Sequence, residues 1–271
     1  MKNKKKFILS CLVIVFFFNF ALSSEEINYS SNTIKILENG KIVSGEGDVQ
    51  IIIDDKIFIS SEKFQFYKET GIYRIFDNVK FKDNINKITA SGSEIIFSTI
   101  DNKVSSKTKS KINYNQTYDI DFNNFEYDIN NQKIRSNDFV KIKDTINNYF
   151  ELYEFLFDLK TNKFLGKEIK FIDNQQNKYF LNEVVVSANN NKIYGKEIKF
   201  FDNQQNKYLL KEVVIDTDND NLYGRDLDID FNKSLLGNNN NDPRLKAKSI
   251  KIKDQSSFLK KGVFTSCSKD I

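Results

Sequence analysis

The sequence has no tryptophan and no histidine, one proline and only two cysteines among its 271 residues. Without histidine the chain lacks the usual base of a nucleophilic triad and the commonest nitrogen ligand of metals. Two cysteines are too few for a zinc cluster. Most common enzyme classes thereby lose their usual catalytic groups, so we expect no catalytic residue, no metal site and no cofactor.

The first 23 residues have the layout of a secretory signal peptide. Four lysines precede an apolar run over residues 7–22, and the run ends in a small-x-small pattern with cleavage expected near Ser23. An uncleaved anchor is the first alternative, but the run is shorter than the ~20 residues of a spanning helix. A lipoprotein site at Cys11 is the second alternative, and residues 8–10 make a poor lipobox for it. We expect export to the periplasm or the outer membrane.

Export would change the charge and the cysteine content of the chain. The full sequence has 41 basic and 37 acidic residues, and loss of the four leader lysines leaves 37 of each sign. The neutral chain is therefore not a basic nucleic-acid binder, and we expect no nucleic-acid partner. Cys267 would be the only remaining thiol, and we expect its disulfide partner outside this chain. A harmless free thiol is the alternative.

Two segments of the chain are nearly the same. Residues 166–194 and 195–223 are identical at 19 of 29 positions, and Gly224 begins a third, weaker copy. Each copy opens with alternating polar and apolar residues (GKEIKF), continues through an Asp/Asn/Gln-rich run, and alternates again. Alternation predicts half-buried strands, and Asn and Asp favour turns. Each copy is therefore predicted to be a hairpin unit of about 29 residues.

The repeat belongs to a longer series. An apolar pair followed at fixed spacing by valine occurs in both copies, and it recurs over residues 64–79 and 125–140. The series runs from about residue 34 to about residue 231, and even residues 151–160 favour strand over helix. A closed barrel does not easily gain a copy because its strand number and shear are linked. The sequence therefore predicts an all-β, elongated and open-ended antiparallel structure.

The N-terminal half resembles the repeat of the OstA-like family of lipopolysaccharide transport proteins. The likeness lies in GEGDV (45–49), EKFQFY (62–67), the turn Thr70-Gly71 and DNV (77–79), although the family's Gly before the last motif is missing. The C-terminal segment, with NDPRL (241–245) and KGVFTSC (261–267), is similar to the part of the LptD family that joins its periplasmic domain to a barrel.

The resemblance implies a periplasmic β-jellyroll, a folded-over sheet whose apolar groove carries lipopolysaccharide acyl chains. It implies partners: lipopolysaccharide, a β-jellyroll bridge protein joined by edge-strand pairing, and an outer-membrane barrel or its lipoprotein plug. It divides the chain into a signal peptide (1–23), an OstA-like domain (24–240) and a linker segment (241–271). The 271 residues contain no segment like the family's barrel, so we expect a fragment, a truncated frame or a free-standing periplasmic piece.

The residues expected to line the groove are the alternating apolar ones. They are Val49, Ile51, Ile53, Phe64, Phe66, Val79, Phe81, Ile169, Phe171, Ile198, Phe200, Leu227 and Ile229. The same residues would form an ordinary core if the sheet closed completely, because a groove lining and a core share one stripe.

Other functions stay open at this point. A closed core would suit a structural or adhesive β-repeat protein, and a β-solenoid with paired carboxylates could cleave polysaccharide. Lysine-rich stretches at 103–114 and 244–253 could contact lipid phosphates or form solvated edge charges. Residues 216–220 resemble half of a calcium loop, but Asn221 and Leu227 replace its Gly and carboxylate, so a turn is predicted.

Overall fold

The computed structural model describes residues 26–173, 178–187, 190, 192–202, 204–219, 221–237, 241–253 and 256–267. The expected signal peptide lies outside these residues. Within the described ranges, no helix combines the length and the apolar character needed to span a membrane.

The described chain forms one 21-stranded antiparallel sheet with two 3-10 turns, η1 (Glu38–Gly40) and η2 (Lys233–Leu236). The strands are β1 (Ile27–Ser30), β2 (Thr33–Leu37), β3 (Ile42–Ile53), β4 (Ile57–Tyr67), β5 (Ile72–Asp83), β6 (Ile88–Ser98), β7 (Lys103–Ser106), β8 (Ser110–Tyr114), β9 (Tyr118–Phe122), β10 (Phe125–Asp128), β11 (Lys133–Ser136), β12 (Val140–Asp144), β13 (Tyr149–Asp158), β14 (Lys163–Ile172), β15 (Lys178–Ser187), β16 (Lys192–Phe201), β17 (Lys207–Asp216), β18 (Asn221–Asp230), β19 (Arg244–Lys253), β20 (Ser256–Lys260) and β21 (Val263–Thr265).

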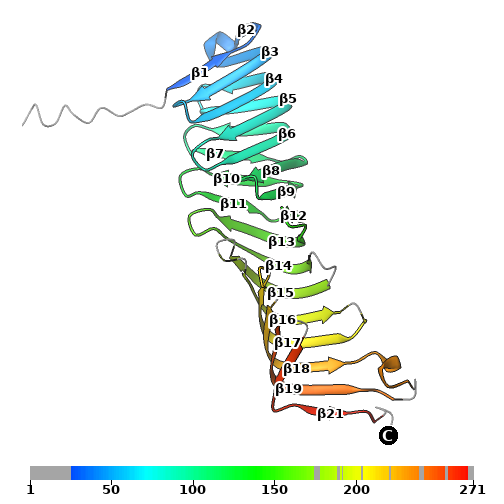
Figure 1. Ribbon diagram of the computed structural model, residues 1–271. Helices are drawn as coiled ribbons and strands as arrows, with labels where there is room; N and C mark the ends of the chain where they lie inside the picture. Colours follow the sequence, from blue (N-terminus) through cyan, green and yellow to red (C-terminus); the bar gives the residue numbers. More distant parts are fainter. Residues whose placement is uncertain are drawn as a thin grey trace, which may run out of the picture.

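Successive hairpins stack along one direction, from β1–β3 at one end to β19–β21 at the other (Figure 1). Each copy of the repeat forms one hairpin: β14 pairs with β15 in the first copy and β16 pairs with β17 in the second. The register differs little between the two hairpins. Strands β19–β21 continue the same sheet beyond residue 240. The prediction of an elongated all-β sheet built from hairpin repeats is confirmed.

Each long strand crosses a corner at which its alternation shifts by one residue. In β14, Phe164 and Gly166 are buried, Lys167 and Glu168 are both exposed, and burial resumes at Ile169. The same pair of exposed residues interrupts β15 to β18, and register shifts occur at this place in β3 to β5. The shift turns both halves of each strand toward the same interior, so one sheet folds over on itself along a crease.

The crease divides the sheet into two walls. The first wall holds β2, 42–46, 63–67, 72–76, 94–98, β7, β10, β11, 155–158, 163–167, 183–187, 192–196, 212–216, 221–225, 249–253 and β20. The second wall holds β1, 49–53, 57–61, 79–83, 88–92, β8, β9, β12, 149–152, 169–172, 178–181, 198–201, 207–210, 227–230, 244–247 and β21. Hairpin turns border the two walls opposite the crease, and we call the line between these borders the mouth.

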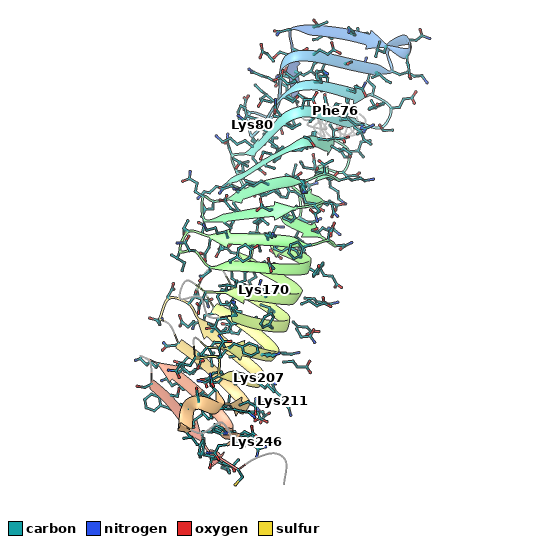
Figure 2. The ribbon with its side chains drawn as sticks, turned by 90° about the vertical axis from the view of Figure 1, so that its right-hand side faces the viewer. Phe76, Lys80, Lys170, Lys207, Lys211 and Lys246 are labelled. Carbon is teal, nitrogen blue, oxygen red and sulfur yellow. The ribbon has the colours of Figure 1, made fainter. Side chains whose placement is uncertain are left out.

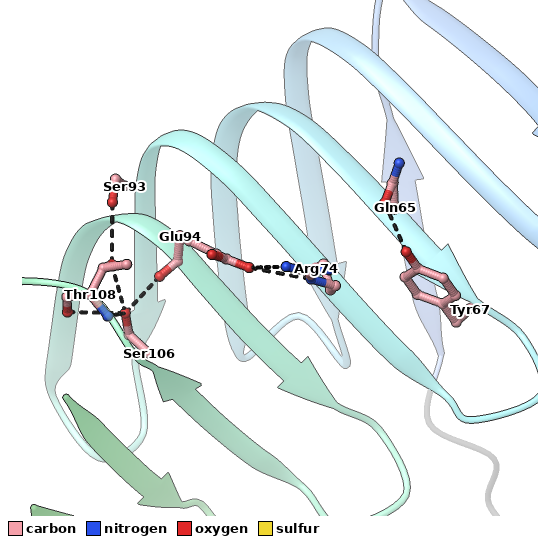
Figure 3. Close-up of polar contacts among 7 residues, drawn as sticks. All are labelled: Gln65, Tyr67, Arg74, Ser93, Glu94, Ser106 and Thr108. Atoms are coloured by element: carbon pink, nitrogen blue, oxygen red, sulfur yellow. Dashed lines mark hydrogen bonds and ion pairs between the residues drawn. The ribbon is translucent and has the colours of Figure 1, made fainter.

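In the middle of the molecule the corner becomes a break, because β7 and β8 are separate strands on different walls. Hydroxyl groups hold this break together (Figure 3). Ser106 donates its Oγ hydrogen to the backbone oxygen of Glu94 at 2.8 Å, and Thr108 lies within 3.2 Å of Ser106 and Ser93. Arg74 pairs with the Glu94 carboxylate at 2.7 Å on the neighbouring strand. Side-chain hydrogen bonds and an ion pair therefore connect the strands at the crease, where the backbone hydrogen bonds are interrupted.

Partly or fully buried Asp side chains close several of the turns at the mouth. Asp144 accepts hydrogen bonds from the backbone of Asn148 at 2.8 Å and from its amide group at 2.8 Å. Asp202 and Asn206 repeat this pair of contacts in the second copy. Asp216 accepts from both the backbone and the side chain of Asn219, so its carboxylate caps a turn, as the sequence predicted.

Glycines at the crease accept a leucine from the preceding strand. A Cβ atom on Gly195 would lie 2.7 Å from Cδ2 of Leu181, and the corresponding atoms of Gly166 and Gly224 would meet Leu152 and Leu210. None of these glycines has the left-handed backbone that requires glycine. Glycine is therefore needed here for space, and each repeat places one leucine over one glycine.

We expect Gly195→Val to lower the free energy of unfolding by about 2 kcal/mol, because the added branch overlaps Leu181 in a packed interior. Adding Leu181→Ala should recover part of that loss, so the double variant should be more stable than the sum of the single variants allows. Urea unfolding of the four proteins measures this coupling. Gly262→Val is the control, because its nearest neighbour would be 3.7 Å away; strictly additive losses would contradict the packing.

The corner also places charged residues in the left-handed region. Glu168, Glu197 and Asp226 have φ of 50°, 51° and 51° at equivalent positions of successive repeats. Left-handed backbone costs roughly 1–2 kcal/mol for most residues and less for Asn. The bend of the sheet therefore holds local strain once in each repeat.

We expect Glu197→Asn to raise the free energy of unfolding by about 1 kcal/mol and Glu197→Val to lower it, because a φ of 51° costs Asn less than Glu and costs the β-branched Val more. Thermal unfolding of both variants measures the difference. Equal midpoints for the two variants would show that the corner is unstrained.

Candidate lipid-binding interior

The thirteen residues expected to line a groove all lie on inner faces of the folded sheet. Phe64 and Phe66 belong to the first wall, and the other eleven belong to the second wall. Twelve are at most 6% exposed, and Phe66 is half-buried against the same cluster. The sequence prediction therefore named inner residues of the second wall and few of the facing wall, and their contact with a ligand stays a prediction.

The overlooked inner residues of the first wall include Tyr127, Phe157, Phe164, Ile193 and Ile215. Their signal was present in the sequence as a second alternating run, displaced by three positions from the first. In the repeat, Phe164 and Gly166 lead to Ile169 and Phe171. A strict period of two assigns the two runs to opposite faces, which is why the facing wall was missed.

A ladder of aromatic rings follows the second wall across five strands. Phe150, Phe171, Tyr179, Phe200 and Tyr208 are register partners in turn, and adjacent ring centroids lie 4.7–5.1 Å apart. The sequence prediction named only Phe171 and Phe200. Tyr179 and Tyr208 follow the Asn/Gln-rich run of the sequence at the same place in each copy, so the repeat itself carried the missing signal.

Rings of opposite walls touch across the interior. Tyr114 meets Phe157 at 4.9 Å and Phe150 meets Phe164 at 5.4 Å, and in each pair the two rings come from different strands on opposite walls. The interior is thus filled by side chains in this conformation. A ligand between the walls would have to replace these contacts. The walls can separate most readily at the mouth, which lies opposite their covalent connection at the crease.

One polar contact joins the walls beside the mouth. The Tyr127 hydroxyl, on the first wall, donates to Oδ2 of Asp83 at the end of a second-wall strand, at 2.7 Å. Asp83 also accepts from the backbone and the amide group of Asn86. Burial, with the Asp83 carboxylate adding to it, raises the pKa of Tyr127 far above that of a free phenol. The neutral hydroxyl is therefore strongly favoured in the folded state.

Other inner tyrosines share this behaviour. Burial raises the pKa of Tyr118 to about 12, with a smaller contribution from the Asp144 carboxylate. Burial raises the pKa of Tyr208 as well, and Asp202 accepts its hydroxyl hydrogen at 2.9 Å. Tyrosine serves here as an apolar ring with a hydroxyl that reaches the polar rim.

The outer faces carry charges that pair across strands. Lys170 contacts Glu151 at 3.0 Å and Lys246 contacts Asp228 at 3.1 Å on the second wall, and both lysines are labelled in Figure 2. In the lysine-rich stretch 103–114, Lys111 contacts Asp119 at 3.3 Å. These contacts fit solvated edge charges; contact with lipid phosphate stays a prediction.

Within the described ranges, no three His, Cys, Asp or Glu side chains gather into a possible metal site. Cys267 is exposed, and its backbone oxygen accepts from Arg244 at 3.3 Å. Its pairing with a cysteine of another chain stays a prediction.

Both ends of the described sheet present unpaired strand edges. Strands β1 and β2 pair only with β3, and β20 and β21 pair only with β19. These strands carry exposed apolar residues: Ile34, Ile36, Phe258, Val263 and Phe264. Free edges with apolar side chains favour strand addition from another sheet.

The geometry defines a folded-over antiparallel sheet of the jellyroll type with an apolar interior and free ends. No protein-family model and no curated protein matches the chain. Among solved structures, it is similar to the crystal structure of LptH, the LptA homologous periplasmic component of the conserved lipopolysaccharide transport device from Pseudomonas aeruginosa. The TM-score is 0.37 and the identity 12%, over 41% of this chain and 80% of that chain. A likeness of this size establishes neither a family nor a function.

We expect Tyr127→Phe to lower the free energy of unfolding by about 1 kcal/mol, because Asp83 loses a buried donor. The raised pKa means that Tyr127 stabilises the fold fully below the ordinary tyrosine pKa of ~10 and that this contribution is lost as pH rises above it. The variant should therefore lose stability less steeply than the native protein in alkaline solution. Unfolding curves at neutral and alkaline pH measure both effects.

Tyr153→Phe is the matched control, because Tyr153 is exposed. It should leave the alkaline slope unchanged. A Tyr127→Phe protein with the native slope would show that this hydroxyl does not couple the two walls.

Proposed function

We propose that this chain is a periplasmic lipopolysaccharide-binding and transport domain that holds acyl chains between its two walls. The observation that carries the proposal is the continuous apolar inner face of a sheet that is joined along one side only. Because the walls are connected at the crease and meet by side-chain contacts elsewhere, they can part along the mouth without breaking the strand ladder.

The physical basis is apolar burial. An acyl chain that replaces ring contacts between the walls keeps the inner face out of water, and each buried Å² contributes ~25 cal/mol. The aromatic ladder from Phe150 to Tyr208 offers a continuous surface along the direction of transport. No covalent step and no cofactor is needed for this function.

The free ends of the sheet support the proposed partners. Edge pairing at β2 or at β20 and β21 would join this sheet to a β-jellyroll bridge protein and extend the apolar interior between them. An LptD-like role, with delivery to an outer-membrane barrel or its lipoprotein plug, is the finer proposal. It includes export by the N-terminal segment and an intermolecular disulfide at Cys267.

A structural or adhesive role is the second candidate, and a specific observation favours it. Phe171 is fully buried and Phe200 is only 6% exposed, as expected for a closed core. In that role the walls never part, and the interior only stabilises an elongated surface protein. The two candidates differ in whether lipid reaches the inner face.

Photo-crosslinking in cells separates the two candidates. We expect a photoreactive residue at Phe171 or Phe200 to form adducts with lipopolysaccharide, because both side chains point into the interior. The controls are the outward neighbours Lys170 and Lys199, which lie on the same strands. Adducts at the two inner positions alone support transport. A folded and exported protein without adducts at any position would leave the structural candidate in first place.

A further inference from the structure

The outer face of the first wall carries two parallel rows of side chains over β14 to β18. The members of each row are successive register partners, so each row runs straight across the strands. The apolar row consists of Leu165, Val185, Tyr194, Val214 and Tyr223. The charged row consists of Lys167, Glu183, Lys196, Glu212 and Arg225.

Both rows alternate strictly from strand to strand. Large side chains stand on β14, β16 and β18, where Leu165, Tyr194 and Tyr223 are 39%, 40% and 42% exposed. The smaller Val185 and Val214 stand on β15 and β17. The charged row alternates in step with the apolar row. Strands β14, β16 and β18 carry a basic residue in it, and β15 and β17 carry a glutamate. The alternation follows from the two-strand repeat.

The shape of this outer face follows the alternation of large and small side chains in the apolar row. A hollow of about 490 Å³ lies over Val185 between Leu165 and Tyr194, and a second of about 470 Å³ extends past Tyr223. The two hollows adjoin, because both are lined by Val214. The face therefore presents knobs and hollows in turn.

Over the described strands this apolar row is continuous in one half of the molecule, whereas in the other half β6 places a single apolar residue, Ile96, at its position. On β3, β4 and β5 the positions of the apolar row hold Ser44, Gln65 and Arg74. A contiguous exposed apolar patch beside polar surface marks an interaction site. The row begins at Leu156 on β13, the register partner of Leu165, and its absence from β3 to β5 shows that folding alone does not require it.

We propose that this face binds a second copy of the chain, face to face, about a twofold axis that runs parallel to the strands between β15 and β16. Such an axis reverses the order of the strands and keeps each position along a strand. The apolar row then faces the apolar row of the partner copy, and the charged row faces the charged row. Two sheets packed in this way have nearly aligned strands, an arrangement that is common in β-sandwiches.

The apolar row is complementary to itself under this symmetry. Each Tyr194 faces Val185 of the other copy, and each Leu165 faces Val214. A large side chain therefore meets a hollow at all four central positions, while at the two outer positions Tyr223 faces Leu156 of β13. Isologous contacts require this kind of self-complementarity.

The charged row is complementary to itself as well. Each Glu183 faces Lys196 of the other copy, and each Lys167 faces Glu212. Arg225 faces Glu154 of β13, which pairs with Lys167 at 2.6 Å and lies next to Tyr153, the register partner of Lys167. Within one copy Glu183 and Lys196 are 3.9 Å apart and more than 60% exposed. The charges of Glu183 and Lys196 are thus accessible to a second chain. A twofold axis that passed through a strand, and not between β15 and β16, would place like charges opposite one another.

Charge reversal tests the proposal on protein expressed from the full chain. Native protein should form dimers in sedimentation velocity runs over a range of concentrations. Lys196→Glu alone would oppose Glu183, and Glu183→Lys alone would oppose Lys196, so each variant should dimerise about tenfold more weakly. An equimolar mixture of the two variants should regain the native affinity as a heterodimer, because every opposed pair is then of opposite sign. Native mass spectrometry with one variant isotope-labelled identifies that species.

The matched control is Lys63→Glu, which breaks a similarly exposed pair with Asp77 outside the patch. It should dimerise like the native protein. A native protein that stays monomeric, or a dimer that Lys196→Glu leaves unchanged, as expected for pairing at the strand edges, would overturn the proposal. Loss of dimer in both single variants without recovery in the mixture would overturn the proposed axis.

Discussion

The exposed pair of residues at the middle of each strand is the constraint on which the whole structure depends. A flat antiparallel sheet with alternating residues has one apolar face and must find another layer to cover it. Here Lys167 and Glu168, with their equivalents along the chain, shift the alternation by one residue and bend the strand. The sheet thereby covers its own apolar face, and the strain at Glu168 and the tight fit of Leu152 over Gly166 both arise at this bend.

The same bend explains why the interior has two possible uses. Each wall is held together by strand pairing, whereas the two walls are held to one another by ring packing and by contacts such as that of Tyr127 with Asp83. The stability of each wall and the stability of the contact between the walls are therefore separate quantities. A lipid carrier needs a weak contact between its walls, whereas a structural protein needs stable walls and a stable contact between them.

The sequence predicted the all-β class, the hairpin repeat and the inward direction of residues such as Phe171 and Phe200, because alternation and turn residues are local signals. It did not reveal the facing wall, since Phe157 and Phe164 belong to a run displaced by the corner. Nor did it reveal the outer rows, because register decides which residues of neighbouring strands stand side by side. Whether an inner residue meets lipid depends on how easily the walls separate, which no local pattern encodes.

A repeat of two strands also sets a rule of parity for how this molecule can change in length. One repeat leaves the first wall and returns to it, so gain or loss of a whole copy moves later strands by about 10 Å along the stack and keeps each half-strand on its own wall. Gain of a single strand would send every later segment in the opposite direction and reverse its crossing of the crease. The near-identity of residues 166–194 and 195–223 is thus what remains of a duplication of one two-strand unit. Such a unit is the smallest insertion that leaves the rest of the sheet unaltered.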